Sequence, residues 1–217
     1  GLHAAHELRD ASDRPLHLVH RDVSPQNVII GADGIGRITD FGVASAEARL
    51  SSTHGGQLKG KLGYMSPEQS RSEPVDRRTD IYAAGVILWE VLAGGRRFRA
   101  GNEAAVLKVL AEGAVRPLRE LNPFVPEALE ACCLRALARD ASERFATAAD
   151  FAEATEKAAV LGGIGVASTR AVATFVTELQ AHERPVDLPA APPPSARASL
   201  VFANSQRRSL PEIPAAA

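Results

Sequence analysis

The most hydrophobic stretch of the sequence runs from Asp80 to Leu92, and its apolar side chains fall on nearly every face of a helix. A helix that is apolar all round is typical of the centre of a protein core. Gly94 and Gly95 follow directly, and glycine commonly ends a helix. The pattern therefore predicts a buried central helix over 80–92.

Other segments with helical spacing of apolar residues cover 2–8, 102–113, 129–138 and 147–160. Asn102 can cap the second of these, and Pro126 suits the first turn of the third. Thr147 and Asp150 form a variant of the capping box at the start of the last. The predicted fold class is mainly α with a small β-hairpin.

The hairpin is predicted from two short β-branched runs, Val28–Ile30 and Ile35–Ile38. Gly31–Gly34 joins them and contains an Asp-Gly pair, which favours a tight turn. Beyond the hairpin, Ala44–Gly60 is rich in Ser and Gly and has no sustained period. We expect a long mobile loop there, and such loops are commonly functional.

These patterns predict one domain over residues 1–161. An accessory helix is predicted within 162–183, with its apolar positions between Ser168 and Gln180 on one side. Residues 184–217 are rich in Pro and Ala and have little apolar periodicity, so we expect a disordered tail.

The charge balance gives no long-range field that favours nucleic acid or an acidic membrane. The chain has 25 Lys and Arg against 26 Asp and Glu, and a formal net charge of -1. Its two cysteines, Cys132 and Cys133, are adjacent in an apolar helical pattern, where buried, inert thiols are expected. No apolar run is long enough to span a bilayer. We predict a cytoplasmic protein without a nucleic-acid partner.

Three residues around the hairpin predict phosphoryl-transfer chemistry. Asp22 lies on the loop before the hairpin, Asn27 where the first strand begins, and Asp40 where the second strand ends. The hairpin should fold these side chains together. Phosphoryl transfer requires alignment of a hydroxyl and metal ions that neutralise phosphate charge. We predict that Asp22 accepts the hydroxyl proton and that Asp40 and Asn27 bind Mg²⁺.

The order and spacing of three motifs, found over about residues 2–160, resemble the carboxyl-terminal lobe of the eukaryotic-like Ser/Thr protein kinases of bacteria. His20–Asn27 resembles the catalytic loop of that family, and Asp40-Phe41-Gly42 resembles its magnesium loop. Gly60–Glu68 resembles its substrate-docking loop. The resemblance implies ATP and Mg as cofactors, a protein substrate with a Ser or Thr hydroxyl, and a second kinase chain as a dimer partner.

The same resemblance assigns supporting roles. It implies that His20 and Phe41 stack on Asp80, that Ile29 lies beneath the adenine, and that Gly42 belongs to the magnesium loop. It also implies a Glu68–Arg144 ion pair, which would be bidentate and buried. Arg21 beside the base implies control by a phosphate on the loop, and the candidate acceptors there are Ser51, Ser52 and Thr53.

Two positions depart from the family pattern. Ser24 stands where the family has a lysine that contacts the transferred phosphate, and Lys61 replaces the threonine of the docking loop. These positions are neighbours in the kinase fold. Our hypothesis is that Lys61 supplies the missing ammonium; the alternative is a solvated Lys61 and a weakened catalyst.

A Gly-rich loop over the phosphates and a strand lysine paired with a helix glutamate are not found among these residues. The chain begins at Gly1, and its only methionine is Met65, so we expect a fragment. We predict that it lacks kinase activity alone. A kinase-like scaffold or binding module is the alternative, and small-molecule phosphotransferases are disfavoured by the docking loop and Arg144. Tyrosine as the acceptor stays open.

Overall fold

The computed structural model describes residues 1–41, 62–97 and 103–182, with only the backbone of 103–105. The described part is rich in helices and contains one antiparallel sheet of two strands, which confirms the predicted fold class. The chain divides into two units, Gly1–Leu179 and Gln180–Ala217. The predicted boundaries at 161 and 183 stay predictions. The loop predicted over 44–60 and the tail predicted over 184–217 lie outside the described residues.

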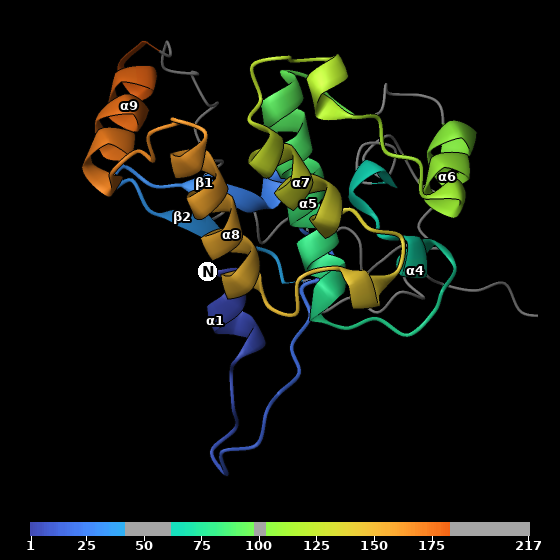
Figure 1. The fold of residues 1–217 in the computed structure, drawn as a ribbon. Coiled ribbons are helices and arrows are strands. Elements are labelled where there is room, and N and C mark those ends of the chain that lie inside the picture. The colour runs from blue at the N-terminus through green and yellow to red at the C-terminus, as the bar shows by residue number, and fades with distance from the viewer. Residues whose placement is uncertain (42–61, 98–102, 183–217) are drawn as a thin grey trace, which may run out of the picture. The chain divides into compact units, whose positions relative to one another are not determined.

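Helix α5, Arg77–Ala93, runs through the centre of the first unit, and α7 and α8 pack against it (Figure 1). Asp76 caps it by accepting a hydrogen bond from the Arg78 amide. At Gly85 the helix approaches α7 so closely that an added Cβ would lie 2.8 Å from the Cβ of Ala136. The prediction of a buried central helix is confirmed, except that Val91 is 71% exposed at the last turn.

The main core contains residues of α5 and of the following helices. These are α6, Glu103–Glu112, α7, Glu127–Ala136, and α8, Ala148–Leu161. Leu110, Leu118 and Cys133 are fully buried there beside Val86 of α5. A smaller cluster consists of Ile81, Ala136, Phe145 and Phe151. The capping box of Thr147 and Asp150 at the start of α8 is confirmed.

The hairpin consists of β1, Val28–Ile30, and β2, Gly36–Ile38, paired in the register Val28 to Ile38. Asp33 orders the turn, because its carboxylate accepts the Ile35 amide and pairs with Arg37. This guanidinium lowers the pKa of Asp33 below its ordinary value. Gly34 has a φ of +74°, and an added Cβ would lie 2.1 Å from the carbonyl oxygen of Thr169 in α9. Glycine is therefore required at this position.

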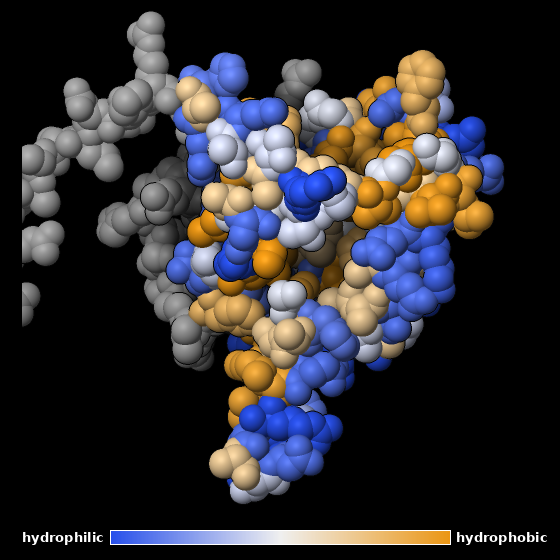
Figure 2. All heavy atoms as spheres, turned by 90° about the vertical axis from the view of Figure 1, so that its left-hand side faces the viewer, coloured by the Kyte–Doolittle hydropathy of each residue, from blue (hydrophilic) through white to orange (hydrophobic). Residues whose placement is uncertain are grey.

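A loop projects from the domain between α1, Leu2–His6, and His20 (Figure 1). An antiparallel bridge joins Arg9 to Pro15, and the Asp10 carboxylate accepts the Ser12 and Arg14 amides. Figure 2 shows a hydrophilic tip on this projection, with apolar side chains next to it. Residues 10–15 therefore form the ordered end of this loop.

Helix α9, Thr169–His182, corresponds to the predicted accessory helix, and its first turn lies against the hairpin turn at Gly34. None of its residues is buried, and Phe175 is 60% exposed. No helix in the described ranges is both long and apolar enough to cross a membrane.

Candidate active site

The segment of His20 and Arg21, directly before the predicted base, is fixed to the core helix by the carboxylate of Asp80. Asp80 lies in the first turn of α5 and is fully buried. Its two oxygens accept the backbone amides of His20 and Arg21, both at 2.7 Å. The ring of His6 from α1 lies 2.8 Å from the same carboxylate. The Asp80 carboxylate thus has three partners, and the positive end of the helix dipole also favours its charge.

His20 connects this anchor to the hairpin. Its Nε2 donates to the carbonyl oxygen of Thr39 at 2.9 Å, while its Nδ1 lies 3.2 Å from the amide of Asp22. These contacts fit a neutral ring with its proton on Nε2. The Phe41 ring lies against His20 with 4.5 Å between centroids. His20 therefore contacts the residues on both sides of Asp40.

Asn27 holds the predicted base. Its side-chain nitrogen donates to the backbone oxygen of Asp22 at 2.8 Å and lies 3.2 Å from Oδ2 of the same residue. Its backbone oxygen accepts the amide of Thr39 at 2.9 Å. One asparagine thus connects the base to the end of β2, where Asp40 follows. The structure brings Asp22, Asn27 and Asp40 to the same end of the hairpin.

Two residues at this end have a backbone conformation that L-amino acids rarely adopt. Arg21 has a φ of +65° and Asp40 a φ of +57°. Such conformations cost on the order of 1 kcal/mol each and persist only where the surroundings enforce them. Here the contacts of Asp80 and His20 enforce them, so the site is held in a defined geometry by the core.

The donor set fits a magnesium ion that also binds nucleotide phosphates. Mg²⁺ in such sites takes one or two protein oxygens and completes its shell with phosphates and water. Asp40 is exposed, and the Asn27 amide nitrogen faces Asp22, which leaves the amide oxygen on the opposite side. Across the described ranges, no group of three or more His, Cys, Asp or Glu gathers in a way that could hold a metal by itself.

Glu68 and Arg144 form a buried bidentate ion pair with distances of 2.7 and 2.8 Å. Glu68 lies in α4, Pro67–Ser70, and Thr79 of α5 donates a third hydrogen bond to it at 2.7 Å. The other donors of Arg144 bind backbone oxygens, those of Arg78, Ala138 and Arg139. All five N–H groups of this guanidinium are satisfied, as a buried arginine requires.

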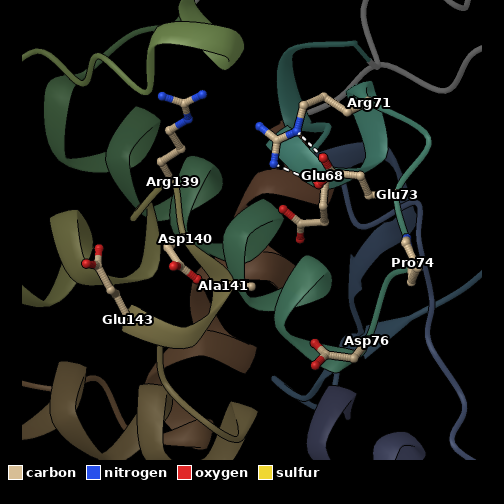
Figure 3. Close-up of a pocket in the computed structure, with 9 residues that line it drawn as sticks. All are labelled: Glu68, Arg71, Glu73, Pro74, Asp76, Arg139, Asp140, Ala141 and Glu143. Carbon is tan, nitrogen blue, oxygen red and sulfur yellow. Dashed lines mark hydrogen bonds and ion pairs between the residues drawn. The ribbon is translucent and has the colours of Figure 1, made fainter.

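The charge state of Glu68 follows from these contacts. Burial by itself would raise the pKa of the carboxyl, but the hydrogen bonds from Arg144 and Thr79 outweigh it and lower the pKa to about 2. A surface hollow of about 850 Å³ lies beside this pair. Figure 3 shows Asp76, Asp140 and Glu143 around it. Its lining contains none of the residues of the hairpin site, so it is a separate feature.

Three of the remaining predicted site residues lie in the described part of the chain, and five lie outside it. Ser24 is buried, and its hydroxyl has no hydrogen-bond partner among the described residues. Ile29 is 52% exposed on β1, and Arg21 is exposed. Gly42, Ser51, Ser52, Thr53 and Lys61 lie outside the described residues.

Sequence reasoning missed three residues that hold the site together: His6, Thr39 and Gln69. Gln69 of α4 donates to the backbone oxygen of Arg21 at 2.9 Å. A single histidine or glutamine in a helix has no local pattern that marks such a role. Thr39 contributes its backbone, which the sequence does not reveal.

Comparisons with known proteins show which family the chain belongs to. The profile of the protein kinase domain matches residues 12–154. Tyrosine-protein kinase MasK of Myxococcus xanthus is 48% identical over 72% of this chain and 24% of its own length. A probable serine/threonine-protein kinase PknB of Bifidobacterium longum is 32% identical over 81% of this chain and 26% of its own.

Serine/threonine-protein kinase PrkC of Bacillus subtilis is 35% identical over 61% of this chain and 20% of its own. Among solved structures, the PknI kinase domain of Mycobacterium tuberculosis matches 65% of this chain and 46% of its own, with 27% identity and a TM-score of 0.47. The chain spans about a quarter of the length of the first curated relatives. With the kinase profile matched over most of its length, this chain belongs to the protein kinase family.

Proposed function

We propose that these residues form the base, metal and substrate side of a protein kinase that transfers the γ-phosphate of ATP to a Ser or Thr hydroxyl. Asp22 accepts or orients the hydroxyl proton, and Asp40 and Asn27 hold magnesium. Ile29 lies beneath the adenine. The observation that carries the proposal is the bonding of Asn27, which fixes Asp22 and the strand end before Asp40 together.

The chain would contribute to phosphoryl transfer mainly by positioning its side chains. Phosphoryl transfer has a loose transition state, so alignment and charge neutralisation supply most of the catalysis. Magnesium, when bound, neutralises phosphate charge. The chain holds the Asp22 carboxylate through Asn27 and holds the preceding backbone through Asp80. The contacts of His20 with Thr39 and Phe41 hold the residues on both sides of Asp40.

The phosphate-facing cation is proposed to come from Lys61. The buried hydroxyl of Ser24 carries no charge and has no described hydrogen-bond partner, so this position supplies no ammonium. In a form of the protein that phosphorylates a substrate, Lys61→Ala should lower kcat by at least about tenfold, and Ser24→Lys should restore part of the loss. An unchanged kcat in Lys61→Ala would show that the cation is not needed.

Control by phosphorylation is proposed for the same site. A phosphate on Ser51, Ser52 or Thr53 would meet the exposed guanidinium of Arg21, which directly precedes the base. Mass spectrometry of the protein purified from its natural host should find phosphate on at least one of the three, and Arg21→Gln should remove its effect on activity.

The direct test compares phosphotransfer by longer forms of the protein with that of the 217-residue chain. Because the chain has neither a glycine-rich loop nor a strand lysine in its sequence, we expect no measurable activity from it alone. In an active longer form, Asp22→Asn should lower kcat at least about 100-fold. Asp13→Asn, an exposed carboxylate on the projecting loop, is the matched control. Robust phosphorylation by the 217-residue chain would contradict the first expectation.

The acceptor is tested by phosphoamino-acid analysis of the product. We propose serine and threonine, as the names of PknB and PrkC suggest. The relative MasK is named a tyrosine-protein kinase, so phosphotyrosine is the second candidate. An aminoglycoside antibiotic offered as acceptor should stay unmodified. Failure of every longer form to phosphorylate any hydroxyl would favour the scaffold instead.

A further inference from the structure

Gln69 connects two segments that are 48 residues apart. At one end, its side-chain oxygen accepts a hydrogen bond from the backbone amide of Ser66 at 3.0 Å. The backbone amide of Gln69 lies 3.4 Å from the Ser66 hydroxyl. This is the capping box that starts α4. At the other end, its side-chain nitrogen donates to the backbone oxygen of Arg21 at 2.9 Å. The capping of α4 requires only the contacts with Ser66 and not the hydrogen bond to Arg21.

The oxygen that Gln69 holds belongs to the peptide group directly before Asp22. The amide of Arg21 is already held by Asp80 at 2.7 Å, and its φ is +65°. The amide of Asp22 has a longer contact, 3.2 Å, to His20. The hydrogen bond from Gln69 therefore fixes the plane of the Arg21–Asp22 peptide, which sets the direction in which the Asp22 side chain leaves the backbone.

We infer that Gln69 is a positioning residue for Asp22 and that it couples α4, the helix that contains Glu68, to the base. The inference rests on the proposed function, since it takes Asp22 as the base. It predicts that the orientation of Asp22 changes when the donor of Gln69 is lost, even where α4 stays capped. Helix α4 begins at the end of the predicted substrate-docking loop. The hydrogen bond of Gln69 thus connects the end of that loop to Asp22, the group proposed to activate the substrate hydroxyl.

Two substitutions separate the cap from the catalytic contact. Gln69→Glu keeps an oxygen that accepts the Ser66 amide, and glutamate is a normal capping-box residue. It replaces the donor that faces the Arg21 oxygen with a second acceptor. Ser66→Ala does the reverse, because it removes the capping hydroxyl and leaves the Gln69 donor. Gln69→Ala, which removes both, serves as a second variant if Gln69→Glu does not fold.

The first readout is hydrogen exchange of the Asp22 amide in the 217-residue chain, which needs no catalysis. Gln69→Glu should speed this exchange about tenfold, because the loss of about one hydrogen bond to the Arg21–Asp22 peptide makes its local opening easier, while the amides of α5 exchange as before. Ser66→Ala should lower the melting temperature, followed by Trp89 fluorescence, without selectively speeding the Asp22 amide. Unchanged exchange in Gln69→Glu, or equal effects of both substitutions on the Asp22 amide, would overturn the inference.

The second readout is kinetic, in a longer form with activity. Gln69→Glu should lower kcat roughly fivefold, about the effect of one hydrogen bond, and leave KM for ATP unchanged. A rise in KM with an unchanged kcat would overturn the positioning role. If exchange of the Asp22 amide rises but no form of the protein transfers phosphate, the contact is upheld and the proposed kinase function fails.

Discussion

Replacing Glu68 by glutamine tests how much the buried ion pair contributes to folding. A fall of the Glu68 pKa from its ordinary value of 4.5 to about 2 corresponds to about 3 kcal/mol of stability. Because the folded-state pKa is lowered, this contribution is complete above pH 4.5 and is lost as the pH falls towards 2. Glutamine keeps the shape, but its amide group must face a donor of Arg144 or Thr79. We therefore expect a loss of about 3 kcal/mol at pH 6.

The assay is urea unfolding followed by the fluorescence of Trp89, the single tryptophan, which is buried in α5. The difference in free energy of unfolding between the native chain and Glu68→Gln should narrow from about 3 kcal/mol at pH 6 to about 1 kcal/mol at pH 3. Glu153→Gln is the matched control, because it breaks an exposed ion pair with Lys157 and should cost less than about 1 kcal/mol. A Glu68→Gln difference that stays constant between pH 6 and pH 3 would refute the reasoning.

Three further predictions concern other parts of the first unit. Asp80→Asn should lower the free energy of unfolding by about 2 to 4 kcal/mol and speed exchange of the His20 and Arg21 amides, because a neutral group replaces their charged acceptor. Burial raises the pKa of the Cys133 thiol to about 12, so at pH 8 it should react with iodoacetamide at least about 100-fold more slowly in the native chain than in urea. Gly34→Ala should detach α9 from the hairpin and speed proteolysis between α8 and α9, because the new Cβ would overlap the Thr169 oxygen; equal proteolysis would contradict this contact.

The local elements could be predicted from sequence where their causes are local. The Asp-Gly pair at Asp33 predicted the hairpin turn, and its side chain does order that turn. Helix α7 was predicted to reach Ala138 but ends at Ala136. Beyond Ala136 the chain turns, and the carbonyl oxygen of Ala138 accepts a hydrogen bond from Arg144. Such a contact leaves no trace in the periodicity of the helix itself.

The site shows the same division. The proposed catalytic residues, Asp22, Asn27 and Asp40, were predicted to lie together from their order and spacing, because the hairpin between them is itself readable from the sequence. Some of the residues that hold them, unlike Asp80 and His20, could not be predicted. His6 and Gln69 bind partners 74 and 48 positions away, and for Gln69 the partner is a backbone oxygen, which every residue carries.

The difference between the residues that could be predicted and those that could not has a physical origin. It lies in how the backbone at Arg21, which has a positive φ, is held in place. The left-handed conformation of Arg21 is unfavourable locally, so the local sequence cannot produce it. It persists because Asp80 binds the amide on one side of Arg21 and Gln69 binds the carbonyl on the other. Asp80 is anchored in the core helix, and Gln69 lies in α4 beside the ion pair of Glu68 with Arg144. The backbone geometry around Asp22, the proposed base, therefore depends on the same contacts that hold the domain together, and substitutions that weaken these contacts should disturb Asp22 before they unfold the chain.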